Sequence, residues 1–375
     1  MARALGVAVL GYGGVARAHI TALRRYAEAF SDAPAVATLV AIAGRSADAL
    51  ATAAHRFGAP RWTTDWRTLL EDPSVDVLID AGPNDVHAEP SIAALHAGKA
   101  VLCEKPLART AGEADAMARA AERAGGAAMT GFNYRFVPAV LLARDLIRNG
   151  RLGRIFHFSG RYCDDSLLDP DTPYGWRQDR AVAGSGVIGD LASHLIDLAH
   201  FLAGPIAAVS ATVRTYVHSR PSGGTRKAVT AEDALAATLE FRDGAIGTVE
   251  ASGMCPGRKN FMAFEINGEQ GTLAFNLERL NELRVYHGDG EARGLADVLV
   301  TDRTHPYGGR WWPPGHILGW EHTFVHQFEE LVRRVTGAGG EMVGATFADG
   351  LACARVCDAL LAAAEEGARV AVPPR

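Results

Sequence analysis

Three polar side chains recur at helical spacing in the middle of the chain. Asp190, His194 and Asp197 follow a glycine-rich stretch and precede Gly204. At about 100° per residue, the three fall within an arc of roughly 60° on a helix. A carboxylate can orient an imidazole ring, and a histidine can move a proton at neutral pH. The spacing indicates either an acid–base pair or a solvent-facing pair that stabilises the helix by a few tenths of a kcal/mol.

A stripe of leucines predicts which face of this helix is buried. Leu191, Leu195, Leu198 and Leu202 recur at i, i+4, i+7 and i+11. This pattern is typical of a face packed in a core. We therefore expect the acid–base pair to lie on an adjacent, accessible face.

A glycine-rich turn near the N-terminus lies between a predicted strand at residues 5–10 and a predicted helix at 15–30. Its pattern is G-x-G-x-x-A, in which one glycine permits a tight turn and the next lets a pyrophosphate approach the backbone. The unpaired N–H groups of the helix N-terminus favour such an anion. The alternative is a tight turn without a ligand. The predicted cofactor-binding residues here are Gly11, Tyr12, Gly13, Gly14 and Val15.

Strands and helices alternate through the first third of the chain, which indicates a parallel, doubly wound Rossmann sheet. At the end of the second strand, an NAD enzyme usually carries an acid for the ribose 2′-hydroxyl. Gly44 occupies that position, followed by Arg45 and Ser46. Arg45 can pair with a 2′-phosphate, stack on adenine or remain solvated. These residues alone therefore leave the choice between NAD and NADP open.

Glu104 and Lys105 follow the fifth predicted strand. Parallel sheets bind ligands beyond the carboxyl ends of their strands. A lysine there can donate to a substrate hydroxyl and stabilise a developing alkoxide. The alternative for an isolated lysine is a surface charge.

Length and composition set broader limits. A chain of 375 residues is too long for one ordinary core, so we expect a dinucleotide-binding domain at 1–132 and a substrate and oligomerisation domain at 133–375. The net charge of −5 offers no basic patch for nucleic acid. No apolar run reaches transmembrane length, and the N-terminal one is too short for a signal peptide. Five scattered cysteines suit a reducing cytoplasm.

The second part of the chain predicts an α+β domain with a large, mostly antiparallel sheet. A helix at 138–149 precedes a series of strands, and Asp243-Gly244 and Asn267-Gly268 are hairpin signals. Residues 220–227 are rich in Gly, Ser and Pro, which predicts a mobile loop. One sheet face would carry the helix of residues 190–202.

A pair of histidines, His322 and His326, stands at i and i+4 of a predicted helix. This is half of a zinc site. No third ligand is suggested by spacing, so no metal is expected.

These motifs together resemble the Gfo/Idh/MocA family, named for glucose–fructose oxidoreductase and inositol dehydrogenase. The matching stretches are 11–16, Pro83-Asn84 with His87, 101–106, 131–135 and 189–197. Further stretches at 169–177, 183–186 and 305–316 resemble the branch that contains levoglucosan dehydrogenases and sugar 3-dehydrogenases. The resemblance implies an NAD(P)-dependent dehydrogenase that oxidises a secondary ring hydroxyl of a sugar, sugar derivative or cyclitol, with NAD as the expected cofactor and NADP possible. It also implies a homodimer or homotetramer formed through the second domain's sheet.

The resemblance assigns roles to individual residues. It implies that Lys105, Asp190 and His194 are catalytic. It adds further cofactor contacts, namely Pro83, Asn84, His87, Glu104, Lys105, Trp176 and Arg177. It implies a substrate site made by Lys105, Tyr134, Arg135, Asp164, Arg177, Asp190 and His194.

Asp164 departs from the pattern of that branch, in which we expect a glutamine, and Ser166 departs where a tryptophan is expected. An ionised aspartate only accepts hydrogen bonds and is costly to bury unpaired. A cation should therefore face Asp164, either an arginine such as Arg177 or an ammonium on an amino sugar or aminocyclitol. Arg177 is the simpler expectation.

Three other functions remain open at this point. A reductase working from NADPH would differ in direction and cofactor. An NAD-retaining glycosidase of the same fold would cleave glycosides without net nicotinamide turnover. A non-catalytic sugar-sensing regulator would have lost the three catalytic residues.

Overall fold

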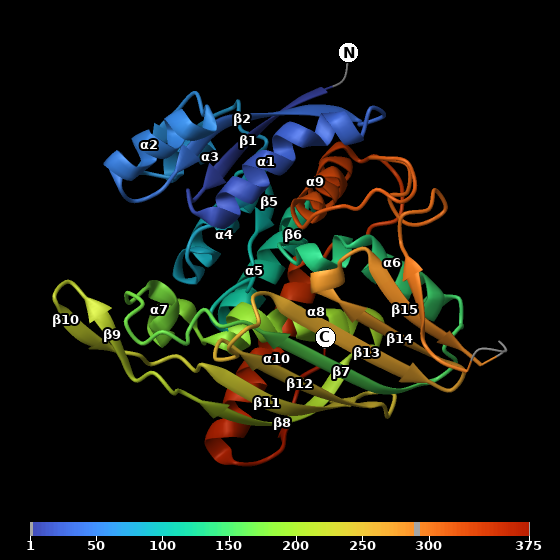
Figure 1. Ribbon diagram of the computed structural model, residues 1–375. Coiled ribbons are helices and arrows are strands. Elements are labelled where there is room, and N and C mark those ends of the chain that lie inside the picture. Colours follow the sequence, from blue (N-terminus) through green and yellow to red (C-terminus); the bar gives the residue numbers. More distant parts are fainter. Residues whose placement is uncertain (1–2, 289–292, 375) are drawn as a thin grey trace. The chain divides into compact units, whose positions relative to one another are not determined.

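The computed structural model describes residues 3–288 and 293–374, which divide into two compact units (Figure 1). The first unit comprises residues 1–136 and 319–351, and the second comprises 137–318 and 352–375. The predicted division at 132/133 differs in two respects, because residues 133–136 and 319–351 belong to the first unit. Their helix α9 (Glu321–Thr336) packs on α1 (Gly14–Ala29), and the ring of Phe328 meets that of Tyr26 at 5.5 Å between centroids.

The first unit contains a six-stranded sheet in the order β3-β2-β1-β4-β5-β6, with every neighbouring pair parallel. The strand order reverses between β1 and β4, and doubly wound sheets bind ligands at such a point. The strands are β1 (Arg3–Leu10), β2 (Ala35–Ala43), β3 (Trp62–Thr63), β4 (Val77–Asp80), β5 (Ala100–Cys103) and β6 (Ala128–Thr130). The connecting helices are α2 (Ala47–Phe57), α3 (Arg67–Glu71), η1 (Asn84–Val86), α4 (Ala88–His96), α5 (Ala111–Ala124) and η2 (Asn133–Phe136).

The second unit contains a nine-stranded sheet in which only β7 and β12 pair in parallel. The predicted fold class, a Rossmann sheet followed by a large, mostly antiparallel sheet, is confirmed. In sheet order the strands are β16 (Ala296–Leu299), β15 (Glu282–His287), β14 (Gly271–Asn276), β13 (Phe261–Gly268), β7 (Ile155–Cys163), β12 (Ile246–Ser252), β11 (Ala234–Phe241), β8 (Ile206–Arg214) and β17 (Val370–Ala371).

Helices cover one face of this sheet, on which α8 packs against β7 (Figure 1). Side chains alternate along β11 and β12 between buried and exposed, so the other face is open. The helices of this unit are α6 (Pro138–Arg148), η3 (Trp176–Gln178), α7 (Arg180–Ala183), η4 (Ile188–Ala192), α8 (Ser193–Leu202) and η5 (Leu277–Arg279), with α10 (Phe347–Glu366) passing from the first unit into the second.

The leucine stripe of residues 191–202 is buried as predicted. Leu191 is 7% exposed, Leu195 0% and Leu202 4%. Burying one such side chain stabilises a fold by roughly 1.5–3 kcal/mol. The stripe therefore fixes the rotation of α8, and with it the direction in which its polar residues point.

The prediction of a mobile loop at 220–227 is wrong. Residues of this segment form a two-stranded hairpin, β9 (Ser219–Ser222) with β10 (Thr225–Ala228). Gly223 and Gly224 make its turn with φ of 57° and 84°. Two consecutive residues with positive φ are what a type I′ hairpin turn requires, and glycine adopts them without strain.

No described helix is long and apolar enough to cross a membrane.

Candidate functional site

The glycine loop after β1 has the geometry of a dinucleotide-binding turn. Gly11 has a φ of 114°, and a Cβ atom there would lie 2.5 Å from the carbonyl oxygen of Ala81 after β4. Only glycine therefore lets the two loops approach at the point where the strand order reverses. The Gly11 N–H also donates to the carbonyl of Ala43 on β2 at 2.8 Å.

The N-terminus of α1 fits the diphosphate of a dinucleotide. Gly13 is its N-cap, and no side chain caps the helix. A Cβ atom on Gly13 or Gly14 would meet no atom within 4 Å. The N–H groups of the first turn thus lie beside open space, where they can donate to phosphate oxygens.

Tyr12 occupies the position where an acid would normally bind the ribose. A Cβ atom on Gly44 would lie 2.6 Å from Cε1 of Tyr12. Arg45 and Ser46 are both exposed beside it. The end of β2 therefore offers a tyrosine ring and a cation in place of a carboxylate.

His87 is fully buried and holds two loops together. Its Nδ1 lies 3.0 Å from the carbonyl oxygen of Pro106, and its Nε2 lies 3.1 Å from that of Gly82. The predicted direct contact of His87 with the cofactor does not fit this burial, and the role of the ring is indirect. The ring connects the loop after β4 to the loop that carries Lys105.

Lys105 is fixed by its neighbour Glu104. One Glu104 oxygen accepts from the Lys105 N–H at 3.1 Å, and the other lies 2.7 Å from Nε2 of His19 on α1. His19 is completely buried, and Lys105 is half-buried. The peptide bond from Lys105 to Pro106 is cis.

Two predicted substrate contacts lie in the core of the first unit. Tyr134 and Arg135 on η2 are each 4% exposed. The guanidinium of Arg135 lies 3.6 Å from a carboxylate oxygen of Asp349 and donates to the carbonyl of Val343 at 3.3 Å. These partners give Arg135 a structural role in joining η2 to the segment after α9.

The acid–base pair of the second unit stands at the junction of η4 and α8. Asp190 lies in the π-helical turn η4 and is half-exposed, whereas His194 lies in the first turn of α8 and is 5% exposed. Inserted π turns are frequent at functional sites. The ring of His194 lies 6.0 Å from that of Tyr162 on β7. The leucine stripe is buried as predicted, but the adjacent face is accessible only at Asp190, because Asp197, like His194, is buried.

Arg177 pairs with Asp190. The Nε atom of Arg177 lies 3.3 Å from Oδ2 of Asp190, and its guanidinium carbon lies 4.3 Å from the ring centroid of Trp176. Cation–π stacking of this kind orients an exposed guanidinium. The expectation that Arg177 faces Asp164 is wrong, because its ion pair is with Asp190.

A cavity of about 320 Å³ brings three of the predicted site residues together within the second unit. Asp164, Arg177 and Asp190 line it, with the acids Glu232 and Asp233 in its wall, whereas His194 does not line it. Burial is the main cause that raises the pKa of Asp164, and the charges of Asp190 and Asp165 add to it. The cavity thus has more carboxylates than cations in its wall, and one member of the acid–base pair lines it.

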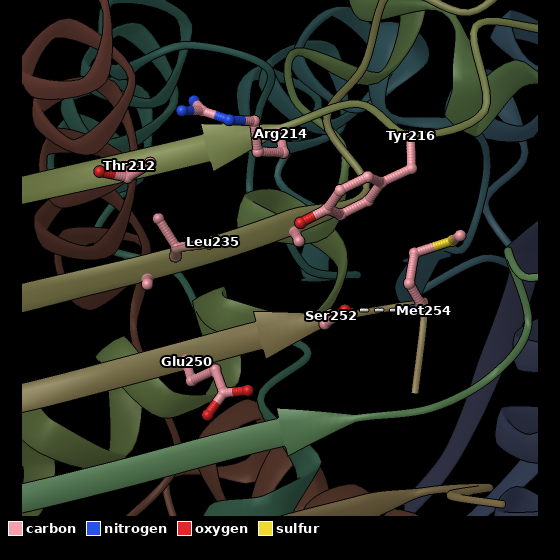
Figure 2. A pocket seen from close by; sticks show the side chains of 9 residues that line it. Thr212, Arg214, Tyr216, Leu235, Glu250, Ser252 and Met254 are labelled. Atoms are coloured by element: carbon pink, nitrogen blue, oxygen red, sulfur yellow. Dashed lines mark hydrogen bonds between the residues drawn. The ribbon is translucent and has the colours of Figure 1, made fainter. Parts of the chain in front are cut away.

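A larger hollow of about 530 Å³ lies on the sheet and contains none of the predicted site residues. Figure 2 shows its side chains at the ends of β8, β11 and β12, where the Met254 N–H donates to Oγ of Ser252 at 3.1 Å. It is lined by Thr212, Arg214, Tyr216, Ala234, Leu235, Ala236, Glu250, Ser252 and Met254. The smaller cavity, in contrast, is lined by Asp164, Arg177 and Asp190.

The two histidines of α9 have other partners. Nδ1 of the fully buried His326 lies 3.0 Å from the carbonyl oxygen of Phe136. Burial lowers the pKa of His326 to about 3. Over residues 3–288 and 293–374, no group of three His, Cys, Asp or Glu side chains is arranged to hold a metal ion.

Sequence reasoning missed two residues of the cofactor half. His19, which holds Glu104, lies on the buried side of α1, and its only sequence signal is a histidine within an apolar helix. Asp80 ends the buried strand β4, and burial raises its pKa to about 6. An acid closing an apolar strand at the ligand edge of a parallel sheet was its available signal.

Two family descriptions match this chain. Residues 5–132 match "Oxidoreductase family, NAD-binding Rossmann fold", and residues 140–274 match "GFO/IDH/MocA C-terminal domain". Together they cover more than half of the chain, in the order that the two sheets follow.

Individual relatives agree with this assignment. The levoglucosan dehydrogenase of Pseudarthrobacter phenanthrenivorans is 38% identical over 98% of both chains. The solved structure of levoglucosan dehydrogenase in complex with NADH and L-sorbose superposes with a TM-score of 0.96 at 38% identity and covers all of both chains. An oxidoreductase domain protein from Kribbella flavida is 42% identical, with a TM-score of 0.95, over 99% of this chain and all of the other.

Proposed function

The chain belongs to the GFO/IDH/MocA family and is an NAD-dependent oxidoreductase of CH–OH groups, and from this premise we propose that it oxidises a secondary ring hydroxyl of a sugar, sugar derivative or cyclitol through Lys105, Asp190 and His194. Relatives named as glucose-6-phosphate 3-dehydrogenase and scyllo-inositol 2-dehydrogenase cover both substrate classes. The reaction is reversible, since a ketone and a reduced nicotinamide are its products.

The observation that carries this proposal is the placement of Asp190 and His194 on successive turns, with Asp190 lining a cavity that contains several carboxylates. An imidazole can accept the hydroxyl proton at neutral pH. Asp190 accepts a hydrogen bond from a neighbouring substrate hydroxyl or orients His194, while Arg177 balances its charge. Lys105, whose backbone is held by Glu104, donates to the reacting oxygen and stabilises negative charge on it.

The cofactor-binding part of the proposal rests on α1 and the end of β2. The N–H groups of the first turn of α1 would hold the diphosphate, and Tyr12 and Arg45 would contact the adenosine end. NAD, when bound, supplies the hydride acceptor. Because Arg45 is a cation and position 44 carries no acid, NADP is tolerated as a second cofactor.

We extend the proposal to assembly and location. The open face of the second unit's sheet, which includes exposed Thr238 and Thr248, is the surface through which a homodimer or homotetramer would form. Light scattering coupled to gel filtration measures that state, and a monomer at micromolar concentration would contradict it. NAD use and five reduced cysteines suit the cytoplasm, which fractionation of the producing cells tests.

Absorbance at 340 nm tests the function. Purified enzyme is mixed with NAD and a panel of sugars and cyclitols, and a steady increase is expected with at least one of them. Glycoside cleavage without net change at 340 nm would favour a hydrolase, and consumption of NADPH only in the reverse direction would favour a reductase. Binding of sugars without any turnover would favour a regulator.

A further inference from the structure

The carboxylate of Asp164 has few hydrogen-bond donors, and it lies in a cavity that also contains the carboxylate of Asp190. Asp164 is half-buried at the end of β7 and lines the 320 Å³ cavity with Asp190. Its Oδ1 accepts from the N–H and the hydroxyl of Ser166, at 2.9 and 2.7 Å, both from its own loop. Within the described part of the second unit, its other oxygen has no hydrogen-bond donor and the carboxylate has no cation within 4 Å.

The nearby cations are engaged elsewhere. Arg177 pairs with Asp190, and Lys259 donates to Asp165 at 2.6 Å. Arg220 is buried and donates to two backbone carbonyls, those of Leu167 and Asp169. The charges that act on Asp164 are those of Asp190 and Asp165, and both are negative.

The other two acids of the cavity wall have the backbone hydrogen bonds that are typical of a structural carboxylate. Glu232 accepts from the N–H groups of Gly186 and Ile188, at 2.7 and 3.0 Å. Asp233 accepts from the N–H groups of Tyr216 and Val217, at 2.7 and 3.0 Å. Each of these two carboxylates is fixed by backbone donors from distant parts of the unit, whereas Asp164 is held only by a residue two positions away.

A half-buried carboxylate beside a like charge loses hydration without gaining a counter-charge, which costs free energy until a cation arrives. An ammonium group on a ligand would supply both the charge and the missing donors. We propose, resting on the proposed sugar dehydrogenase function, that Asp164 is a specificity residue that binds the protonated amine of an amino sugar or aminocyclitol. The neutral analogue of such a substrate would leave the carboxylate unpaired, so the site discriminates against it.

The experiment compares matched sugars that differ in one group. D-Glucose is compared with its 2-amino, 3-amino and 6-amino deoxy analogues and with N-acetylglucosamine, which keeps the nitrogen but loses the charge. For each sugar, kcat/KM with NAD is measured for wild type, Asp164→Asn and Asp164→Gln. Asp165→Asn is the control, because it removes one charge from the adjacent residue, which does not line the cavity.

At least one amino sugar should exceed glucose in kcat/KM by about tenfold or more in wild type, equal to about 1.4 kcal/mol. Asp164→Asn and Asp164→Gln should remove that preference, and Asp165→Asn should keep it. The inference is overturned if no amino sugar is preferred, or if the Asp164 variants leave the preference unchanged. An unchanged preference in Asp164→Asn alone also overturns it, because the carboxylate charge would then not be what binds the amine.

The outcomes separate this inference from the function it rests on. If neutral sugars reduce NAD but amines give no advantage, the dehydrogenase stands and the inference fails. If no sugar of the panel reduces NAD, calorimetric binding of the same sugars to the enzyme–NADH complex decides the inference. Tighter binding of an amino sugar to wild type than to Asp164→Asn supports it, and equal binding overturns it.

Discussion

The ring of Tyr12 lies where a side chain at position 44 would have to be: a Cβ atom on Gly44 would be 2.6 Å from Cε1 of Tyr12. An acidic residue in place of Gly44 would therefore have to displace the tyrosine ring. We therefore expect cofactor choice at this site to depend on Tyr12 and on the exposed Arg45 next to it, instead of on a carboxylate.

Replacing Gly44 with aspartate is expected to raise the KM for both NAD and NADP. An acid in open space would improve discrimination in favour of NAD, but here the steric conflict with Tyr12 dominates. Steady-state kinetics with each cofactor measure the effect, and Arg45→Asp is the control that adds an acid without the conflict. An improved KM for NAD in Gly44→Asp would contradict the steric argument.

Arg45→Ala should weaken the use of NADP by about tenfold or more in kcat/KM, with a much smaller change for NAD. The guanidinium can pair with a 2′-phosphate, which only NADP carries. The ratio of the two kcat/KM values is the measurement. Equal losses for both cofactors would show that Arg45 contacts a group that the two share.

His194→Ala, Asp190→Asn and Lys105→Ala should each lower kcat/KM by roughly a hundredfold or more, as losses of acid–base and charge-stabilising groups do. Fluorescence titration with NADH should show that cofactor binding survives in the first two variants, because Asp190 and His194 belong to the second unit. Near-wild-type turnover of His194→Ala would remove histidine as the base.

The sequence predicted features that follow from local pattern. The glycine turn, the parallel alternation and the leucine stripe of α8 depend on spacing alone, and the structure confirms each of them. Partners that come from distant segments were not predictable in the same way. The ion pair of Arg177 with Asp190 depends on how η3 and η4 fold together, and the π turn at Asp190 changes the helical phase that a regular α-helix would have.

One other miss came from a signal that the sequence did contain. Gly223-Gly224 is a hairpin turn signal, but the surrounding Ser and Pro favoured a loop. The sequence could not predict that His87 is a buried link between two loops instead of a cofactor contact, because both of its partners are backbone carbonyls. Every residue has a backbone carbonyl, so the residue types do not show which carbonyl a side chain contacts.

His87→Gln should lower kcat by about tenfold or more and raise the KM for NAD. The imidazole bridges the carbonyls of Gly82 and Pro106, so its loss lets the loop after β4 and the Lys105 loop move independently. Small displacements of a reacting group can cost up to about a hundredfold in rate. Ser91→Ala on α4 is the control for a buried polar change nearby. An unchanged kcat with only a lower Tm would assign His87 a purely structural role.

The last prediction concerns acid stability and depends on His326. Burial lowers its pKa to about 3, against an ordinary value of 6.5. Between these values the unfolded chain binds a proton at this residue and the folded chain does not, so stability falls as the pH drops from about 6.5 towards 3. The loss is about 1.4 kcal/mol per pH unit for one such group.

His326→Gln keeps a donor for the carbonyl of Phe136 but cannot titrate, so its free energy of unfolding should depend less steeply on pH in this range. Asp80, with its pKa raised to about 6, acts in the opposite sense in both proteins and cancels in the comparison. Urea titrations at pH 7, 6 and 5 measure the two slopes, with the exposed His55→Gln as the control. Parallel slopes for wild type and His326→Gln would show that His326 is not neutralised by burial.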